Sequence, residues 1–191
     1  MKAQEAGALL LAAGQSSRFG GADKLAAPLQ GRPLVHHAAM ALSGLDLGKR
    51  IVVSSRPLPV DWRALGFEEL RLPGGDVMSA SIAAGVAQMR ATGLKACLIA
   101  LADMPFVPAS HFEAMIAHGA HPVLATGHGG KNMVPALFAR EIWGELESLS
   151  GDSGARRLLK DAPAIEVPAQ WLADIDTPEE LARFTQPAGD R

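Results

Sequence analysis

LLLAAGQSSRFGGADK, residues 9–24, joins an uninterrupted apolar run to a turn that is rich in glycine and serine and carries one arginine and one lysine. The apolar run is typical of a buried strand, and the turn follows it directly. Farther along the chain, ACLIALAD (residues 96–103) is a second apolar run, and it ends in Asp103. Strands without polar side chains on either face are typical of the centre of a parallel sheet that is covered on both sides. We therefore expect residues 9–13 and 97–101 to be neighbouring strands.

Apolar runs of strand length alternate with stretches of helical period along the rest of the chain. The predicted strands are residues 6–14, 50–55, 68–74, 96–103, 121–127, 133–139 and 164–169. The predicted helices are residues 33–45, 78–92, 108–119, 140–149, 153–162 and 177–184. This alternation predicts an α/β fold with a mostly parallel central sheet and helices on both faces. We find no repeat or linker, so we expect one domain over residues 1–191 with a flexible tail from about residue 186.

The composition is that of an ordinary soluble protein. Hydrophobic residues make up 48% and charged residues 20% of the chain, and the formal net charge is −2, which argues against nucleic-acid and membrane partners. No apolar run reaches the ~20 residues that cross a bilayer, and the first residues lack the form of a secretory signal, so we expect a cytoplasmic protein. The single cysteine, Cys97, lies in an apolar strand and is expected to be buried rather than catalytic.

The turn after the first strand has the residue types of a phosphate-binding loop. Its small residues, which let an anion approach backbone N–H groups, are Gly14, Ser16, Ser17, Gly20 and Gly21. Arg18 offers a planar fork of donors that matches phosphate, and Lys24 adds a compact charge. The spacing fits neither the Walker A motif nor the dinucleotide fingerprint. A flexible surface turn would explain the glycines and serines alone, but the two cations favour a polyphosphate site.

Carboxylates mark two other places. Asp103 ends an apolar strand beside the predicted phosphate loop, where it is suited to hold Mg²⁺ together with phosphate oxygens. The alternative is that Asp103 caps the helix that follows. Near the C-terminus, Thr177 and Pro178 predict the start of a helix, which leaves Asp174 and Asp176 unexplained. Either of them could supply a second carboxylate to the same metal.

The segment GDSGARRLL, residues 151–159, places Arg156 and Arg157 early in a predicted helix. The helix dipole disfavours cations there unless an anion is near, so this segment is a candidate for binding an acceptor phosphate. Asp152 or Ser153 is expected to cap the helix. A solvated helix face explains the two arginines equally well.

The segment GGDVMSASIAAGV, residues 74–86, predicts a loop and then a helix that Ser79 or Ser81 opens. Small residues at a helix start let a nucleotide approach backbone N–H groups. The alternative is a well-capped helix that only packs on the sheet.

Together, and in this order, the motifs resemble the MobA-like nucleotidyltransferase family. They are LAAGQSSRFGGADKLAAPLQGRPLV (11–35), GGDVMSASIAAGV (74–86), ALADMPFV (100–107), LSGDSGARRLL (149–159) and DIDTPEEL (174–181). Within the family they are most similar to the branch that transfers a cytidylyl group to the molybdenum cofactor. The resemblance implies a three-layer Rossmann-like domain and Mg²⁺-dependent transfer of CMP from CTP to the phosphate of molybdopterin or molybdenum cofactor, with release of pyrophosphate. It also implies small-molecule partners and a receiving molybdoenzyme or its chaperone.

The resemblance also implies roles for individual residues. Catalytic roles are expected for Arg18, Lys24 and Asp103, and Mg²⁺ is expected at Asp103 and Asp176. The nucleotide is expected at Leu11, Ala12, Ala13, Gly14, Ser16, Ser17, Gly75, Ser79 and Ser81, and the acceptor at Asp152 and Arg156. A phosphate acceptor has a second pKa near ~6, so it is largely dianionic at neutral pH and needs no protein general base.

The choice of base remains open between two branches of the family. LAAG, residues 11–14, has the cytidylyl form, whereas RFGGADK and ALADMP resemble the guanylyl-transferring branch. KNMVPALF stands where cytidylyltransferases commonly have a Gly-His-Pro run. A methyl group at Ala13 would narrow the pocket for a purine, which favours CTP over GTP. The alternatives are a guanylyltransferase, a sugar-phosphate or isoprenoid-precursor nucleotidyltransferase, and a non-catalytic protein that binds the cofactor for a partner enzyme.

Overall fold

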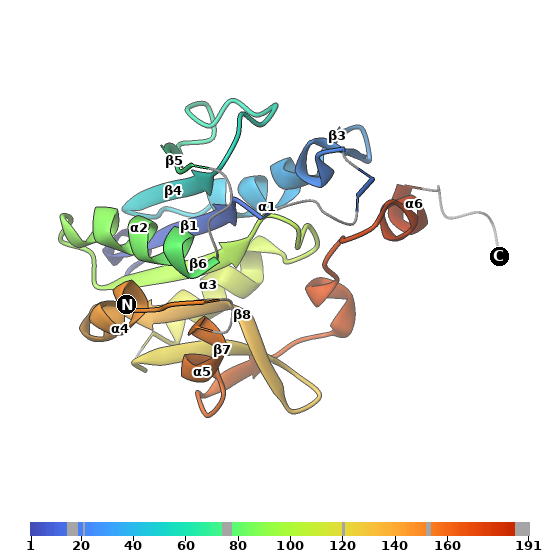
Figure 1. Ribbon diagram of the computed structural model, residues 1–191. Helices are drawn as coiled ribbons and strands as arrows, with labels where there is room; N and C mark the ends of the chain where they lie inside the picture. The colour runs from blue at the N-terminus through green and yellow to red at the C-terminus, as the bar shows by residue number, and fades with distance from the viewer. Residues whose placement is uncertain (15–18, 21, 74–77, 120, 152–153, 186–191) are drawn as a thin grey trace.

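The computed structural model describes residues 1–191 except 15–18, 21, 74–77, 120, 152–153 and 186–191 (Figure 1). Within the described residues, a seven-stranded sheet has the order β5-β4-β1-β6-β8-β7-β9, and β2 and β3 form a separate pair. The strands are β1 (Ala6–Ala12), β2 (Pro28–Leu29), β3 (Arg32–Pro33), β4 (Lys49–Ser54), β5 (Glu68–Arg71), β6 (Ala96–Leu101), β7 (Val123–His128), β8 (Lys131–Ala139) and β9 (Ala164–Glu166). The α-helices are α1 (Leu34–Ser43), α2 (Met78–Arg90), α3 (Ala109–Ala117), α4 (Trp143–Glu147), α5 (Gly154–Leu159) and α6 (Pro178–Thr185). The 3₁₀ turns are η1 (Ala3–Glu5), η2 (Lys24–Ala26), η3 (Arg140–Ile142) and η4 (Ala169–Leu172).

Strands β1 and β6 form the centre of the large sheet, as their apolar sequences predict. Every residue of β1 is buried. β1 pairs in parallel with β6, where Leu11 lies opposite Leu101, and with β4, where Ala12 lies opposite Ser54. The prediction that the two apolar strands are neighbours is therefore confirmed.

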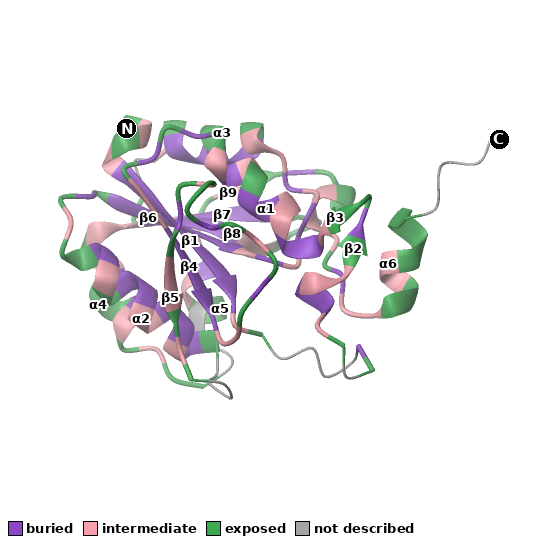
Figure 2. Cartoon of the chain, turned by 90° about the horizontal axis from the view of Figure 1, so that it is seen from above, coloured by how far each residue is buried: buried purple, intermediate pink, exposed green. Residues whose placement is uncertain are grey.

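Helices cover both faces of the sheet, and the alternating side chains of β1 reach both layers (Figure 2). On one face, Leu10 and Ala12 belong to a core cluster with side chains from α1 and α3. On the other face, Leu9 and Leu11 pack with side chains from α2, α4 and α5. This is the three-layer, mostly parallel α/β architecture that the alternation of elements predicts.

One strand departs from the parallel arrangement, which the alternation does not predict. β8 runs antiparallel to both β6 and β7. His128 pairs with Lys131, so the turn between β7 and β8 consists of Gly129 and Gly130, which have φ values of 57° and 76°. Two residues with positive φ form a tight hairpin, whereas a parallel crossover needs about a dozen residues or more. The length of this connection therefore decides the direction of β8.

The connection that leaves β1 and the connection that enters β6 run over opposite faces of the sheet. From β1 the chain passes through α1 to β4 on one face, whereas from β5 it returns through α2 to β6 on the other face (Figure 1). The carboxyl ends of β1 and β6 therefore border the switch point of the sheet. Open α/β sheets bind their ligands in the crevice at such a point.

Two further expectations concern Cys97 and membrane spans. Cys97 is completely buried in β6, and burial raises the pKa of its thiol far above the ordinary range. The thiol is therefore a packing group, as expected.

In the part of the chain that the structure describes, we find no helix with the length and apolar character that a membrane span requires.

The contact between α2 and β1 leaves no room for a side chain at Gly85. An alanine Cβ at this position would lie 2.3 Å from Cδ1 and 2.8 Å from Cδ2 of Leu9, which is fully buried. We expect Gly85→Ala to lower the free energy of unfolding by about 1–3 kcal/mol, because overpacking outweighs the gain in helix propensity of about 1 kcal/mol. Denaturation with urea measures this change.

Gly144→Ala in α4 is the matched control. No part of the described protein outside its own helix backbone and chain neighbours lies within 4 Å of a Cβ at Gly144. This variant should be neutral or more stable by up to about 1 kcal/mol. Equal losses in the two variants would show that the approach of α2 to β1 does not limit stability.

Candidate active site

A buried lysine joins two carboxylates at the carboxyl edge of the sheet. The Nζ atom of Lys24 donates hydrogen bonds to Oδ2 of Asp103 at 2.7 Å and to Oδ1 of Asp176 at 2.6 Å. Lys24 begins η2, and Asp23 caps this turn by accepting a hydrogen bond from the backbone N–H of Leu25 at 3.0 Å. The cap fixes the backbone from which the Lys24 side chain extends.

The electrostatics of the lysine follow from its two partners. Burial lowers the pKa of Lys24, but the adjacent carboxylates of Asp103 and Asp176 raise it more, so the net shift is upward. Lys24 therefore remains a cation throughout the physiological range. Loss of hydration and, to a smaller extent, the charges of Asp176 and Asp103 raise the pKa of Asp174. Asp174 thus lies within electrostatic reach of this cluster.

Backbone contacts hold the two carboxylates in place. Asp103 follows β6, and its carbonyl accepts a hydrogen bond from the N–H of Ile175 at 3.1 Å, which ties the C-terminal segment to the end of β6. Directly after Asp176, Thr177 accepts a hydrogen bond from the N–H of Glu180 at 3.2 Å, and Glu180 accepts one from the N–H of Thr177 at 3.0 Å. This capping box at the start of α6 is the helix start that the sequence predicts.

Asp103 does not cap the next helix. That helix, α3, begins at Ala109 with Pro108 in the capping position. One oxygen of Asp103, Oδ1, is buried and has no hydrogen-bond partner among the described residues. A buried carboxylate oxygen without a partner is costly unless a ligand satisfies it.

The donor set suits a hard cation that a substrate also helps to hold. Two carboxylates lie within hydrogen-bond distance of the same lysine nitrogen, and the described residues contain no group of three or more His, Cys, Asp or Glu side chains arranged to hold a metal. Mg²⁺ commonly takes one or two carboxylates and completes its shell with water and substrate phosphates. Asp103 and Asp176 therefore fit a magnesium site of this kind better than a site made by protein ligands alone.

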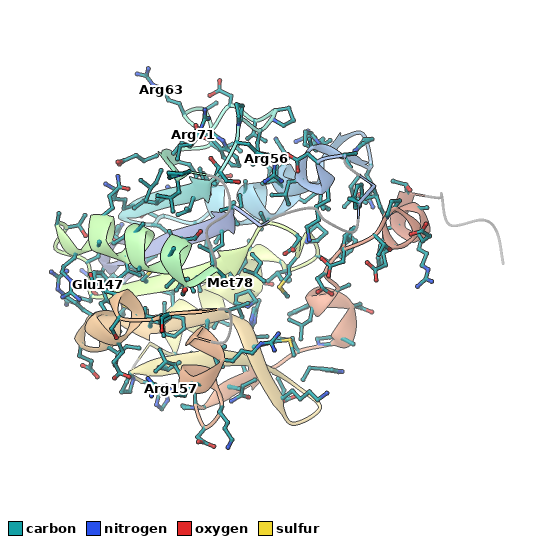
Figure 3. All side chains as sticks on the ribbon, viewed as in Figure 1. Arg56, Arg63, Arg71, Met78, Glu147 and Arg157 are labelled. Atoms are coloured by element: carbon teal, nitrogen blue, oxygen red, sulfur yellow. The ribbon has the colours of Figure 1, made fainter. Side chains whose placement is uncertain are left out.

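A pocket opens at the switch point next to the lysine. It is lined by Leu11, Ala13, Gly14, Lys24, Leu25, Met78, Ser81, Leu101 and Asp103. Met78, labelled in Figure 3, is 48% exposed at the start of α2. The Oγ atom of Ser81 is buried and has no hydrogen-bond partner among the described residues. A polar ligand group in the pocket would satisfy this hydroxyl.

The structure brings some of the predicted site residues together and leaves others apart. Ala12 is buried in the core cluster on the face of the sheet that α1 and α3 cover, and Ser79 is buried in the first turn of α2. Neither is among the described residues that line the pocket. Arg156 is exposed on α5. Ser16, Ser17, Arg18, Gly21, Gly75, Asp152 and Ser153 lie outside the described residues, as does the tail from residue 186.

Sequence reasoning missed Arg56, which follows β4. The Arg56 guanidinium pairs with both carboxylate oxygens of Asp23 and donates a hydrogen bond to the carbonyl of Gly14 at 3.1 Å. The available signal was its position, because Arg56 comes two residues after β4, near the carboxyl end of a parallel strand, where functional residues gather.

Asn132 was also missed. Its side-chain amide donates hydrogen bonds to the carbonyls of Leu159 at 2.8 Å and Ala162 at 2.7 Å. These bonds anchor the end of α5, the helix that carries Arg156. No feature of the segment KNMVPALF in the sequence indicated this contact.

Known proteins resemble this chain in sequence and in fold. A family profile described as "MobA-like NTP transferase domain" matches residues 8–167. The chain is 28% identical to the purine catabolism protein PucB of Bacillus subtilis, over 90% of this chain and 92% of that protein. It is 30% identical to a molybdenum cofactor guanylyltransferase of Cupriavidus metallidurans, over 91% of each chain. The crystal structure of Rv0371c from Mycobacterium tuberculosis has the same fold, with a TM-score of 0.78, 21% identity and coverage of 97% of this chain and 99% of that chain.

The hydrogen bonds from Lys24 to Asp103 and Asp176 predict that replacing Lys24 lowers the free energy of unfolding more than replacing Lys49, which forms a more exposed ion pair. The Lys24 side chain is 9% exposed, and those of Asp103 and Asp176 are 23% and 36% exposed. Lys24→Met would remove the cation that the two carboxylates share, so we expect a loss of about 1–3 kcal/mol in the free energy of unfolding, less than for a fully buried pair. Urea denaturation at neutral pH measures it.

The control is Lys49→Met. Lys49 pairs with Glu68 at 2.8 Å, where the side chains are 25% and 51% exposed, and an exposed pair contributes about 0.5 kcal/mol. If both variants lost the same small amount, Lys24 would not stabilise the carboxylate pair in the folded protein.

Proposed function

Because the chain belongs to the family of MobA-like NTP transferase domains, we propose that it moves CMP from CTP onto the phosphate of molybdopterin or molybdenum cofactor. The observation that carries this proposal is the bridge from Lys24 to Asp103 and Asp176 beside the pocket at the switch point. It combines a fixed cation for phosphate groups with carboxylates for a metal. The molybdenum cofactor guanylyltransferase that is 30% identical to this chain supports the acceptor class.

The proposed reaction is an in-line substitution at the α-phosphorus of the nucleotide. An oxygen of the acceptor phosphate forms a new bond to this phosphorus, and the bond from the α-phosphorus to the bridging oxygen of the β-phosphate breaks. Pyrophosphate leaves with the bonding electron pair. Since the acceptor is already dianionic at neutral pH, the protein needs to position charges rather than remove a proton.

The residues of the site suit this task. Lys24 supplies a permanent positive charge next to the loop that follows β1, and we propose that it offsets charge on the triphosphate together with Arg18. Asp103 and Asp176 are proposed to hold Mg²⁺, and the unpartnered Oδ1 of Asp103 supports this assignment. When bound, the metal would neutralise charge on the transferring phosphate. Arg156 on α5 and Asp152 are proposed to bind the acceptor.

The base is proposed to lie between the end of β1 and the start of α2. Ala13 lines the pocket together with Met78 and Ser81, which supports contact with a ligand at this position. The Ala13 methyl group reduces the space for a second ring, and the buried Ser81 hydroxyl offers a hydrogen bond. These features favour CTP as the nucleotide.

GTP is the second candidate nucleotide. The relatives from Acidiphilium cryptum and Cupriavidus metallidurans, 29% and 30% identical to this chain, are both named molybdenum cofactor guanylyltransferases. The segment ALADMP also resembles that branch. In this case the same residues would transfer GMP to the same acceptor.

The proposed function is tested by mixing the protein with Mg²⁺, CTP or GTP, and molybdopterin, and by measuring pyrophosphate. Release that depends on both the nucleotide and the pterin is expected. Tight binding of nucleotide without release of pyrophosphate would reject transfer and favour a protein that only binds the cofactor for a partner enzyme.

Asp103→Asn tests the metal assignment in the same assay. The change preserves the shape of the side chain and removes its charge, so turnover should fall at least about 100-fold. Asp176→Asn should have a similar effect. Asp174→Asn should have a smaller one, because Asp174 is exposed and Lys24 binds Asp103 and Asp176. Near-normal turnover of Asp103→Asn would place the metal elsewhere.

Ala13→Gly tests the choice of base. If the methyl group limits the pocket, titration calorimetry with Mg²⁺ should show tighter binding of CTP than of GTP by the unaltered protein and a smaller difference in the variant. Leu45→Ala, a buried change in the core on the face of α1 and α3, serves as the control and should leave the CTP to GTP ratio unchanged. Equal affinities of the unaltered protein for both nucleotides would contradict the assignment.

A further inference from the structure

The ammonium group of Lys24 lies between the two carboxylates that suit a divalent cation. Its Nζ atom is 2.7 Å from Oδ2 of Asp103 and 2.6 Å from Oδ1 of Asp176. A Mg²⁺ ion that bound these same two oxygens would lie about 2.0–2.1 Å from each of them. Two cations cannot share this place, so Lys24 has to give up its bonds before both oxygens can bind a metal.

Two roles in the proposed function therefore require different positions of Lys24. While its ammonium group donates to both carboxylates, their negative charges offset its positive charge, and less of that charge acts on a phosphate group. Once the ammonium group turns toward a phosphate, the carboxylates are left to bind another cation. The two roles are compatible only if Lys24 exchanges its partners.

The Lys24 side chain can make this exchange without a change in the fold. Its backbone lies in η2, which Asp23 caps by accepting a hydrogen bond from the N–H of Leu25 at 3.0 Å. Lys24, Gly14 and Asp103 all line the pocket at the switch point. A lysine has a flexible stem of four carbons, so rotation about side-chain bonds is enough to turn the ammonium group from the carboxylates toward an anion in the pocket.

Other contacts hold the backbone of both carboxylate residues. The carbonyl of Asp103 accepts a hydrogen bond from the N–H of Ile175 at 3.1 Å, and the N–H of Asp176 donates to Oε2 of Glu180 at 2.8 Å. Oδ1 of Asp103 is also buried without a hydrogen-bond partner among the described residues, so this carboxylate has an oxygen to offer to a ligand. The pair is therefore suited to receive a cation after Lys24 has turned away.

We propose that Lys24 competes with a divalent cation for the carboxylates of Asp103 and Asp176, and that a polyphosphate anion in the pocket relieves this competition by binding Lys24. The inference rests on the proposed function in one respect, the binding of a metal and a polyphosphate at this site. Its consequence is cooperative binding: each ligand raises the affinity of the protein for the other by the same factor. The competition thus makes the carboxylates a weak metal site until the polyphosphate is present.

Binding of Mn²⁺ without nucleotide, measured by electron paramagnetic resonance, tests the competition. We expect Lys24→Met to bind Mn²⁺ about 10-fold more tightly than the unaltered protein, because the competing cation is gone. Lys24→Gln also removes the charge and should show the same gain, so it replaces Lys24→Met if that variant does not fold. Urea denaturation verifies that each variant is folded. Equal or weaker binding of Mn²⁺ by the folded variants would overturn the proposal.

Titration calorimetry with CTP and GTP, in EDTA and in saturating Mg²⁺, tests the relief of the competition. The factor by which Mg²⁺ raises the affinity for the preferred nucleotide should be at least about threefold larger for the unaltered protein than for Lys24→Met or Lys24→Gln. Binding of Mg²⁺ to the nucleotide in solution is the same for every variant and cancels in this comparison. Equal factors would show that Lys24 repels the metal from a fixed place, which would overturn the exchange.

Lys49→Met is the matched control. Lys49 lies opposite Gly7 at the amino end of β4 and pairs with Glu68. The change removes the same charge far from the pocket, so it should alter neither the binding of Mn²⁺ nor the effect of Mg²⁺ on nucleotide affinity.

Failure of the proposed function is a separate result. A protein that shows both expected effects of Lys24 and releases no pyrophosphate would support the competition and reject transfer. If neither the unaltered protein nor the folded Lys24 variants bound Mn²⁺ or nucleotide, both the metal assignment and the competition would be overturned.

Discussion

The ammonium group of Lys24 is the constraint on which the site depends. Its two carboxylate partners lie 79 and 152 positions away in the chain, so a single cation joins three distant segments. It offsets the negative charges of both carboxylates and so favours the approach of the C-terminal segment to β6. The buried strands β1 and β6 bring the three segments close, but the charge on Lys24 makes their final approach favourable.

The fold was largely predictable because its strongest signals are local. Uninterrupted apolar runs such as CLIAL need cover on both sides, and this requirement alone predicts a central position in a layered sheet. The direction of β8 was not predicted, since it depends on a turn of two glycines rather than on the composition of the strand. The signal was present in the sequence as GHGGK, residues 128–131 being the tip of the hairpin, but the regular alternation of elements on either side concealed it.

The site was predictable where its residues carried a local signal. Asp103 was identified from its position at the end of an apolar strand, Lys24 from its charge in a turn rich in glycine and serine, and Asp176 from its place before a helix start that did not explain it, and the structure brings their side chains together. The choice between Asp174 and Asp176 could not be made from the sequence, because it depends on how the segment before α6 crosses the end of β6. Arg56 was missed for a related reason: its partners, Gly14 and Asp23, become neighbours only through the pairing of β4 with β1.

The position of Asp176 also affects the order in which the molecule can be completed during synthesis. All strands of the described sheet, from β1 to β9, precede Asp176 along the chain. On the ribosome, the sheet and the first two members of the charged cluster therefore emerge before the third. A nascent or prematurely terminated chain can contain every strand and still lack the second carboxylate. Residues 174–176 can therefore reach the end of β6 only after every strand of the described sheet has been made, which separates the completion of the site from the formation of the core.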